Sequence, residues 1–313
     1  MSNINKYQYR KNIIEIVLSL LIVLLSGCSD DGISNVELQS FVLETSDQVI
    51  DCDGEWFNEG KPTNLIIRSK KINGTWEQTK NITIRNCKIK GAIRIMGLGV
   101  NGEAEGVRQS SISLGHTERA QQAAPTNITF TDVTVEGIAR IPMYLSPGTT
   151  YVTVENCTFT GTSVSVTVYM DAESGHNIFR NNTFETIGDR EVIAVDGSAN
   201  NLIESNKFEY TKKGGIYLYR NCGEGGTVRH QTPSYNRILN NTFNLSSLSW
   251  GNYGIWLASR NGNRSYCDND DGYDFGSSID DRDYADFNTV KSNIFTGKSV
   301  REIRDDGREN LVK

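Results

Sequence analysis

The chain has 313 residues, of which 37% are hydrophobic, and its formal net charge at pH 7 is −6. This hydrophobic content is ample for one large core, and no change in composition divides the chain into two domains. The negative charge argues against nucleic acid as a partner, and an acidic ligand would need a local basic patch.

The N-terminal segment predicts export. Lys6, Arg10 and Lys11 form a basic start, an apolar stretch covers residues 13–25, and the sequence Leu-Ser-Gly-Cys ends at Cys28. This order resembles a bacterial lipoprotein signal, in which Cys28 becomes the lipidated first residue of the mature protein. An uncleaved anchor helix is the alternative interpretation.

The resemblance implies a signal peptide over residues 1–27, the lipidated Cys and a polar tether over residues 28–45, and the folded domain over residues 46–313. Ser29, directly after the cysteine, favours the outer membrane over the inner one in this class of protein. We therefore expect an exported, monomeric lipoprotein of the outer membrane or periplasm of a Gram-negative bacterium, which contacts the membrane through its N-terminal lipid.

A phrase of about ten residues recurs seven times through the rest of the chain. Each copy reads as a short strand, rich in β-branched residues and with alternating apolar positions, that ends at an Asn-rich corner. The last large apolar residues of the copies form one column: Ile89, Val135, Phe159, Phe184, Phe208, Phe243 and Phe295. The steps of 24 and 25 residues between its middle members match one turn of a solenoid. The sequence therefore predicts an all-β fold, a single-stranded right-handed parallel β-helix with about 24–25 residues per coil.

A second column stands two residues before the first. Its members are Cys87, Val133, Cys157, Asn182, Asn206, Asn241 and Asn293. In coils stacked about 4.8 Å apart, identical Asn side chains can hydrogen-bond to one another as a ladder. Turn preference alone would explain any one of these asparagines, but it does not explain four of them in register.

The cysteines matter because disulfides persist in the periplasm. Cys87 and Cys157 lie in the inward column, where we expect small buried side chains, and Cys52 is expected to be buried too. Cys222 and Cys267 each follow an Arg-Asn pair in a corner loop. We therefore predict a disulfide from Cys222 to Cys267 that ties the two loops together.

A second strand follows most of the phrases, and its alternate residues point outward. The predicted inward positions are Leu145, Met170, Val195, Leu218 and Leu257. The outward positions just before them are Tyr144, Tyr169, Ala194, Tyr217 and Trp256. Four aromatic residues on one exposed stripe suit the apolar faces of sugar rings, so we predict that this stripe binds substrate. The alternatives are that loops cover the rings or that aromatic residues simply favour strands.

Carboxylates follow the inward positions of two neighbouring coils. Asp171 and Asp196 are 25 residues apart, which is one coil, so they should lie about 5 Å apart on one face. Two close carboxylates repel each other, which raises one pKa and makes an acid and base pair; Glu173 projects from the same edge. The alternative is that aspartates are common where strands end in turns.

The loop over residues 219–230 is the densest polar cluster in the chain. It holds Tyr219, Arg220, Asn221, Glu224, Arg229 and His230, and Arg260 leaves the next coil at the same corner. Arginine forks bind carboxylates, while His230 or Tyr219 could take a proton. We predict catalytic roles for Tyr219, Arg220 and His230. Contacts with substrate are predicted for Asn221, Glu224, Arg229 and Arg260.

Two further segments add candidates. A long insertion before Val135 contains His116 and could fold over the same face as a lid. The acidic loop near Cys267 offers Asp268, Asp270 and Asp271 as weak ligands for calcium, although its spacing departs from an EF-hand and such loops are usually just solvated. No His-X-His or Cys-X-X-Cys motif occurs, so a transition metal is not expected.

The repeats, together with VYMDAESGHN, REVIAVDGSANN and GGIYLYRNCGEGGTVRHQTPSYN, resemble the exported β-helix proteins related to pectate lyases, polysaccharide lyases and mannuronan epimerases. The resemblance covers residues 46–313 and implies the fold more strongly than the reaction. Nearest in character are the β-helix proteins encoded with exopolysaccharide and biofilm matrix genes, which implies a lyase. The set of Asn-Thr-Asp, Asp-Asp, Gly-His-Gly and Arg-Ile-Lys motifs that marks polygalacturonase-type hydrolases is not found, which counts against a pectin hydrolase.

The leading hypothesis is a lyase that cleaves an acidic bacterial exopolysaccharide, of a biofilm or capsule matrix, by β-elimination at a uronic-acid residue. Arg220 or Arg229, with or without calcium, would neutralise the uronate carboxylate, and His230 or Tyr219 would remove the C5 proton.

Two other classes of function stay open. A glycoside hydrolase would use Asp171 with Asp196 or Glu173 as acid and base. A non-catalytic lipoprotein would bind or export the polysaccharide, and then only the aromatic stripe would matter.

Overall fold

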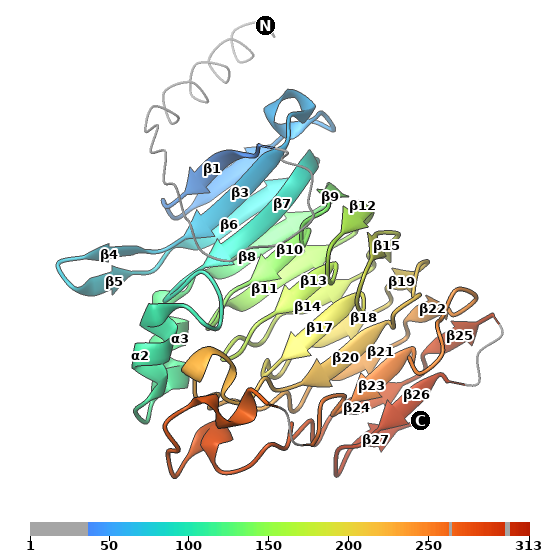
Figure 1. Ribbon diagram of the computed structural model, residues 1–313. Helices are drawn as coiled ribbons and strands as arrows, with labels where there is room; N and C mark the ends of the chain where they lie inside the picture. Colours follow the sequence, from blue (N-terminus) through green and yellow to red (C-terminus); the bar gives the residue numbers. More distant parts are fainter. Residues whose placement is uncertain (1–36, 263–264, 298–300) are drawn as a thin grey trace, which may run out of the picture. The chain divides into compact units, whose positions relative to one another are not determined.

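The computed structural model describes residues 37–262, 265–297 and 301–313 (Figure 1). Leu38–Lys313 form one compact unit, a parallel β-helix in which the chain coils through stacked strands. The predicted signal and its Cys28 lie outside the described residues. Among the residues described, no helix is both long enough and apolar enough to cross a membrane.

One large sheet has nine strands, each parallel to its neighbours. Its spatial order is the chain order: β2 (Gln48–Asp51), β6 (Lys80–Arg85), β8 (Thr126–Thr131), β11 (Thr150–Glu155), β14 (Ile178–Arg180), β18 (Leu202–Glu204), β21 (Arg237–Leu239), β24 (Thr289–Lys291) and β27 (Leu311–Val312). Successive strands of this sheet therefore belong to successive coils, as a solenoid requires.

The other large sheet has sixteen strands in two arms that meet at β7 (Lys88–Met96). The first arm runs through β9 (Thr134–Ile138), β12 (Thr158–Ser163), β15 (Thr183–Phe184), β19 (Lys207–Phe208), β22 (Thr242–Asn244) and β25 (Ile294–Thr296). The second, called the cleft arm below, runs through β10 (Met143–Leu145), β13 (Val168–Met170), β17 (Ile193–Asp196), β20 (Ile216–Tyr219), β23 (Ile255–Leu257) and β26 (Ile303–Asp305). This sheet also includes β1 (Gln39–Leu43), β3 (Thr63–Arg68) and β16 (Ile187–Gly188).

The remaining elements lie outside these sheets. They are the hairpin β4 (Lys70–Ile72) and β5 (Thr75–Glu77), the helices α2 (Glu105–Ser111) and α3 (His116–Ala123), and the 3₁₀ turns η1 (Phe57–Gly60), η2 (Glu224–Gly226), η3 (Cys267–Asn269) and η4 (Gly276–Ser278). Both helices belong to the long insertion that the sequence revealed.

Each repeated phrase forms two strands, where the sequence suggested one. In the phrase from Ile128 the strands are β8 and β9, and the chain bends between them at Asp132, whose φ is 56°. The equivalent bends at Asn156, Asn181 and Asn240 also have positive φ. Asn and Asp adopt this left-handed conformation more readily than other side chains, which is why the corners are rich in them.

The predicted asparagine ladder is present. The side-chain amide of Asn182 donates to Oδ1 of Asn206 over 2.9 Å, Asn206 donates likewise to Asn241 over 2.9 Å, and Asn241 donates to Asn293 over 3.0 Å. The sequence analysis overlooked a second ladder at another corner, built from Asn177, Asn201, Asn236 and Asn288. Both ladders satisfy buried polar groups that the corners would otherwise leave unpaired.

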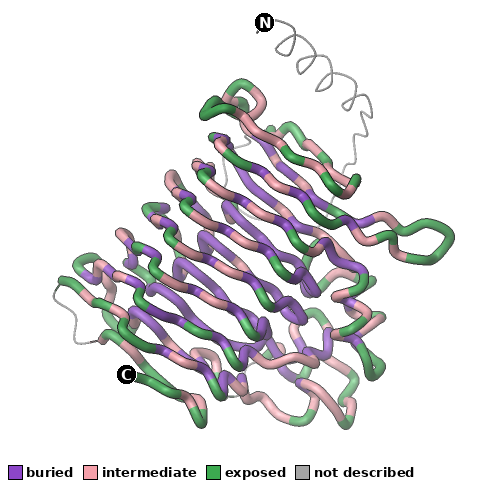
Figure 2. The backbone as a smooth tube through the Cα atoms, turned by 180° about the vertical axis from the view of Figure 1, so that it is seen from behind, coloured by how far each residue is buried: buried purple, intermediate pink, exposed green. Residues whose placement is uncertain are grey.

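The phenylalanines of the first column stack in the core. The ring centroids are 5.0 Å apart from Phe159 to Phe184, 4.9 Å from Phe184 to Phe208, and 4.4 Å from Phe208 to Phe243. Figure 2 shows buried positions running along the middle coils, whereas the first and last coils are drawn as intermediate or exposed. The predicted inward residues of the cleft arm, Leu145, Met170, Val195, Leu218 and Leu257, are all buried. The hydrophobic core is therefore continuous along the solenoid, because like residues of successive coils stack on one another.

Two predictions about the N-terminal part are wrong. The tether cannot extend to residue 45, because β1 starts at Gln39 and pairs in parallel with β3. Cys87 is not a free buried thiol, because it forms a disulfide with Cys52. The register of β2 against β6 sets Asp51 opposite Arg85, which brings the next residue, Cys52, near Cys87. Cys157 is buried and free, as predicted.

We expect Asn206→Ala to destabilise the fold by about 3 kcal/mol or more, because it leaves several buried partners unpaired. Asn206 donates to the carbonyl of Phe179 over 2.8 Å and accepts from the backbone N–H of Asn182 over 2.9 Å. Urea unfolding followed by circular dichroism measures the change. Lys291→Ala, at an exposed strand position, is the control and should change little. Equal stability of the two variants would contradict the structural role of the ladder.

Candidate functional site

A cleft of about 260 Å³ lies against the outer face of the cleft arm. Its lining residues are Asn101, Gly102, Glu103, Ile141, Tyr144, Ser165, Tyr169, Asp171, Arg190, Asn221, Glu224, Arg229 and Arg260. Seven of these were predicted from the sequence as site residues: Tyr144, Tyr169, Asp171, Asn221, Glu224, Arg229 and Arg260.

Three segments far apart in the chain meet at this cleft. In Figure 1 the helices α2 and α3 lie beside the loops that follow β20 and β23. The backbone N–H of Val228 donates to Ser111 Oγ at the end of α2 over 3.0 Å, and Arg229 Nη1 donates to the carbonyl of Gly102 over 3.1 Å. The insertion therefore folds over the same face as the predicted site, as expected from its length.

Asp171 is the buried carboxylate of the cleft. Its side chain is 2% exposed and accepts hydrogen bonds from the hydroxyl of Tyr144 and from the backbone N–H of Ala172. Arg229 Nη1 lies 3.9 Å from Oδ1 of Asp171. Burial raises the pKa of Asp171 to about 6, against the opposing effect of the Arg229 charge. This carboxylate can therefore exchange a proton near neutral pH.

Asp196 occupies the equivalent position one coil later but does not line the cleft. Its oxygens accept from the hydroxyl of Tyr169 over 2.7 Å and from the backbone and side-chain N–H groups of Asn221, each over 2.8 Å. The carboxylate holds the loop after β20 in place. Of the acid and base pair predicted from Asp171 and Asp196, only Asp171 therefore lines the cleft.

Three arginines share the cleft. The guanidinium of Arg229, which is 2% exposed, also donates from Nε to the carbonyl of Asn221 over 3.1 Å. The guanidinium of Arg260 donates to the side-chain oxygen of Asn221 and lies 3.7 Å from the ring centroid of Tyr219. Arg190 donates to Tyr219 Oη and to Glu191, each over 2.8 Å. The protein thus holds three positive charges in fixed positions around one hollow.

Glu224 is a second titratable carboxyl group of the cleft. It begins the 3₁₀ turn η2, directly after Gly223, which lies beside the disulfide between Cys222 and Cys267. This disulfide is the pair that the sequence singled out. Burial and the nearby Asp196 carboxylate raise the pKa of Glu224 to about 7. At neutral pH this group is protonated in a large fraction of molecules.

The structure places three predicted catalytic residues outside the cleft. Tyr219 is fully buried beneath Arg260, and burial raises the pKa of its hydroxyl, so it cannot act as a base near neutral pH. Arg220 Nε donates to the carbonyl of Arg282 over 3.1 Å. His230 Nε2 lies 2.8 Å from the carbonyl of Ser111. These three side chains of the loop over residues 219–230 therefore contact other loops and do not line the cleft.

Glu173, which the sequence predicted as a catalytic residue, does not line the cleft. It is fully buried, and its Oε1 accepts from the backbone N–H of His230 over 2.8 Å. Its other oxygen accepts from the backbone N–H of Gln231 over 3.1 Å and from the hydroxyl of Thr117 in α3. These hydrogen bonds join the insertion to the end of the loop over residues 219–230.

The aromatic stripe has the predicted register but not the predicted exposure. Tyr144 and Tyr217 are each only 7% exposed, whereas Tyr169 and Trp256 are half-buried. The rings of Tyr144 and Tyr169 stack with centroids 5.2 Å apart and line the cleft. Tyr217 and Trp256 pack instead with Tyr253. Tyr217 is therefore covered, as in the alternative interpretation of the stripe, whereas part of Trp256 stays accessible.

The calcium candidates do not gather into a site. Asp270 accepts hydrogen bonds from the backbone N–H of Gly272 and from the hydroxyl of Ser278, each over 2.8 Å. In the described part of the chain, no group of three His, Cys, Asp or Glu residues, including Asp268, Asp270 and Asp271, is arranged to hold a metal ion. The acidic loop is held by its own hydrogen bonds.

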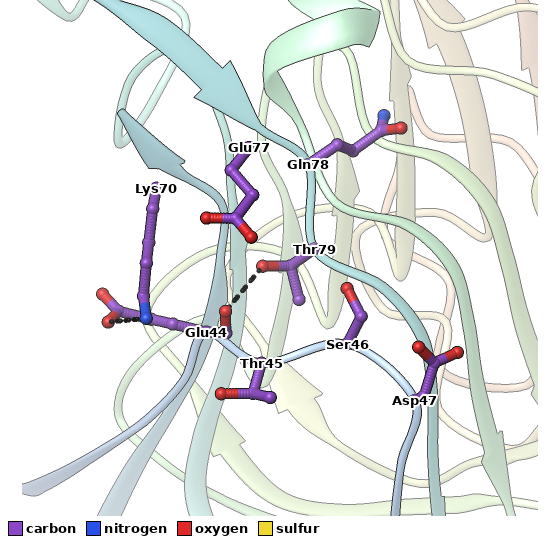
Figure 3. A pocket seen from close by; sticks show the side chains of 8 residues that line it. All are labelled: Glu44, Thr45, Ser46, Asp47, Lys70, Glu77, Gln78 and Thr79. Atoms are coloured by element: carbon purple, nitrogen blue, oxygen red, sulfur yellow. Dashed lines mark hydrogen bonds and ion pairs between the residues drawn. The ribbon is translucent and has the colours of Figure 1, made fainter. Parts of the chain in front are cut away.

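A second hollow of about 270 Å³ lies beside the hairpin β4–β5 (Figure 3). It is lined by Glu44, Thr45, Ser46, Asp47, Lys70, Glu77, Gln78 and Thr79. Lys70 pairs with Glu44 over 3.6 Å, and Thr79 Oγ1 donates to the carbonyl of Glu44 over 3.3 Å. It has neither an aromatic ring nor an arginine, so the other cleft is the better candidate site.

Sequence reasoning missed the cleft residues Arg190, Glu103, Asn101 and Ile141. Arg190 comes two residues before Val192, at the corner that leads into β17, and no repeat position marks it. Glu103 and Asn101 come from the insertion, whose length was noticed but whose path the sequence did not reveal. A search for arginines at the corners before the cleft arm would have found Arg190.

We expect Asp171→Asn to change how stability depends on pH. The pKa of Asp171 is about 6 in the folded protein, above its ordinary value of 3.8, so the wild type loses stability as the pH rises from about 4 to about 6. The asparagine variant does not titrate, and it should gain up to about 3 kcal/mol relative to wild type between pH 4 and pH 7. Urea unfolding at several pH values measures this. Asp189→Asn, at an exposed position, should follow wild type. Parallel curves for wild type and Asp171→Asn would contradict the raised pKa.

A family model and a solved structure match this chain. No curated protein matches this sequence. One solved structure that it resembles is PfbA, a surface protein and adhesin of Streptococcus pneumoniae, with 14% identity over 82% of this chain and 78% of that chain and a TM-score of 0.39. A likeness of that extent says nothing about activity. Residues 63–263 match the family described as the right-handed β-helix region. This protein therefore belongs to the right-handed β-helix family.

Proposed function

We propose that this protein binds an acidic polysaccharide in the cleft and cleaves it by β-elimination at a uronic-acid residue. The observation that carries the proposal is the position of Arg190, Arg229 and Arg260 around one hollow. A β-helix suits polysaccharide-active enzymes and adhesins alike, so the argument for function rests on these side chains and not on the fold.

The charges of the cleft favour an anionic ligand. Against its three guanidinium groups stand the carboxyl groups of Asp171, Glu224 and Glu103. The raised pKa of Glu224, about 7, leaves this group partly neutral at neutral pH. The guanidinium groups of the cleft suit a sugar carboxylate, which an arginine fork can bind through two parallel hydrogen bonds.

The stacked rings of Tyr144 and Tyr169 add a wall beside these charges. Tyr169 is half-buried, so part of its ring is available to the apolar face of a sugar. In a polymer bound here, the sugar carboxylate would contact an arginine and the sugar ring would contact a tyrosine. This combination selects an acidic saccharide over a simple inorganic anion.

In β-elimination a base removes the proton at C5, a double bond forms between C4 and C5, and the bond from C4 to the leaving oxygen breaks. Arg260 and Arg190 would bind the uronate carboxylate and stabilise the charge that develops on it. Ionised Asp171 would take the C5 proton, and protonated Glu224 would give a proton to the leaving oxygen. These assignments replace Arg220, His230 and Tyr219, which lie outside the cleft.

Hydrolysis is the second candidate, and the same two carboxyl groups favour it. Two acids in one cleft with pKa values of about 6 and about 7 are suited to act as a general base and a general acid. A hydrolase of the same substrate class would pair Asp171 with Glu224, not with Asp196. A protein that binds the polysaccharide without cleaving it would use the arginines and tyrosines alone.

We also propose that the protein is exported and anchored by a lipid on Cys28. The disulfides between Cys52 and Cys87 and between Cys222 and Cys267 support this, because disulfides persist outside the cytoplasm. An acidic polysaccharide of a biofilm or capsule matrix would be accessible to a protein in that location.

The test is to incubate the protein with a panel of acidic bacterial exopolysaccharides while recording absorbance near 235 nm and new reducing ends, with and without a chelator. Both signals together identify an eliminase, because the new double bond absorbs. Reducing ends without absorbance identify the hydrolase. Binding without either signal would contradict catalysis.

Arg260→Gln should lower kcat/KM by about 100-fold, because it removes a charge aligned with the substrate carboxylate. Arg237→Gln is the matched control, since Arg237 is exposed at the start of β21 in the nine-stranded sheet. Its kcat/KM should equal that of wild type. Equal losses in both variants would point to a general effect of net charge and would contradict the proposed role.

Activity should be highest between pH 6 and pH 7. The base must be ionised, which requires a pH above the Asp171 pKa of about 6, and the acid must be protonated, which requires a pH below the Glu224 pKa of about 7. Glu224→Gln should abolish the alkaline limb of the kcat/KM profile together with most of the activity. An unchanged alkaline limb in this variant would exclude Glu224 as the acid.

A further inference from the structure

One exposed residue in each coil forms a column where the chain enters the nine-stranded sheet. We call it the corner column; its middle members are Tyr151, His176, Asn200, Tyr235 and Phe287. Each stands two residues before a member of one row of mutually paired residues: Thr153 pairs with Ile178, Ile178 with Leu202, Leu202 with Arg237, and Arg237 with Thr289. The five side chains therefore stack in register along the solenoid.

The backbone of this column is hydrogen-bonded in the same way in every coil. The N–H of His176 donates to the carbonyl of Ala199 over 3.1 Å, and the N–H of Asn200 donates to the carbonyl of Ser234 over 3.1 Å. Neighbouring members are thus fixed one coil apart, about 4.8 Å. The column lies away from the cleft, none of whose lining residues belongs to it.

Four members of the column are aromatic and form two stacked pairs. The rings of Tyr151 and His176 are 5.1 Å apart and 10° from parallel, and those of Tyr235 and Phe287 are 5.3 Å apart and 9° from parallel. Tyr151 and Tyr235 are each 57% exposed, and Phe287 is 50% exposed. Such a row of exposed rings is unusual on a soluble surface and marks an interaction site.

Between the two pairs the row lacks one ring, because this coil carries Asn200 instead. His176 and Tyr235 are two coils apart, which places their rings about 9.6 Å from each other. A ring inserted between them would lie about 4.8 Å from each, the spacing that the stacked pairs themselves show. The gap therefore accepts one six-membered ring with an aromatic face on both sides.

The fold does not require aromatic residues at these positions. Every member of the column has positive φ, for example 53° at Tyr151 and 59° at Tyr235, and Asn fills the equivalent positions at Asn81 and Asn127. A bulky aromatic residue in this conformation is strained, whereas Asn tolerates it. Strained residues that the fold does not need are typical of functional sites.

We propose that the gap over Asn200, between the rings of His176 and Tyr235, is a carbohydrate-binding site that holds one pyranose ring of a polysaccharide. The apolar faces of the sugar pack on the two aromatic rings. The exposed side-chain amide of Asn200 offers both donors and an acceptor to the hydroxyl groups. This site does not depend on the chemistry of the cleft, and it would hold a polymer to the protein whether or not the cleft cleaves it.

The test is electrophoresis of the full chain through native gels that contain either hydroxyethylcellulose or alginate, one neutral and one acidic probe. The wild type should be retarded at least twofold in one of these gels, relative to a gel without polysaccharide. His176→Asn and Tyr235→Asn should each abolish the retardation caused by this site. Both variants should stay folded, because Asn suits the positive φ of these positions better than an aromatic residue.

Asn200→Tyr gives a sharper comparison, because it removes no ring. The new ring fills the gap and stacks on both neighbours, which offsets the strain of an aromatic residue at the positive φ of Asn200, as at Tyr151 and Tyr235. The variant should therefore stay folded, yet it should lose the retardation. Trp250→Ala is the control for loss of an exposed aromatic residue, since Trp250 is 93% exposed on a loop, and it should migrate like wild type.

Two results would overturn the proposal. One is the absence of retardation of the wild type in both gels. The other is retardation that persists in His176→Asn and Asn200→Tyr. Arg260→Gln separates the site over Asn200 from the cleft. If retardation is lost only in Arg260→Gln, binding belongs to the cleft and the proposal is overturned. If retardation is lost only in His176→Asn, Tyr235→Asn and Asn200→Tyr, the proposal is supported and the cleft shows no measurable binding.

Discussion

Hydrogen bonds between the backbones of successive coils hold each residue about 4.8 Å from the equivalent residue of the next coil. This spacing places side chains of the same position directly above one another, so that a column of like residues becomes a continuous interaction. Phenylalanines stack at 4.4 to 5.1 Å in the core. Asparagines form ladders at two corners. Each coil depends on its neighbours for these contacts, and therefore stability belongs to the stack and not to any single coil.

The candidate site arises where this regularity is interrupted. The insertion with α2 and α3 and the loops after β20 and β23 carry no repeat, and their side chains meet outside the cleft arm. Buried charges accumulate there: Arg229 lies 3.9 Å from Asp171 and is otherwise held by the carbonyls of Gly102 and Asn221. Removing such charges from water is costly unless hydrogen bonds replace the water. The regular solenoid supplies the rigid frame that keeps this unfavourable arrangement in place.

The same distinction explains how much the sequence could predict. The columns were readable because their period is a property of the backbone, and they correctly placed the core, the first asparagine ladder and the register of Asp171 with Asp196. The orientation of loop side chains was not readable. Arg220 and Arg229 belong to one loop, yet one stacks on Tyr284 and the other lines the cleft, because distant segments of the chain decide which way each turns. The burial of Tyr217 depends in the same way on Tyr253, which the repeat pattern does not indicate.

The two Tyr–Asp pairs show how a repeat can give rise to a site. The hydroxyl of Tyr144 donates to Asp171, and the hydroxyl of Tyr169 donates to Asp196, so the repeat produces the same pair in two coils. The loop after β20 then makes them different. It contributes Asn221, which donates twice to Asp196 and fixes that carboxylate as a structural group. The same loop places Arg229 beside Asp171 and leaves that carboxylate on the cleft with a pKa raised to about 6. The repeat thus places two equivalent carboxylates one coil apart, and one irregular loop gives them different surroundings.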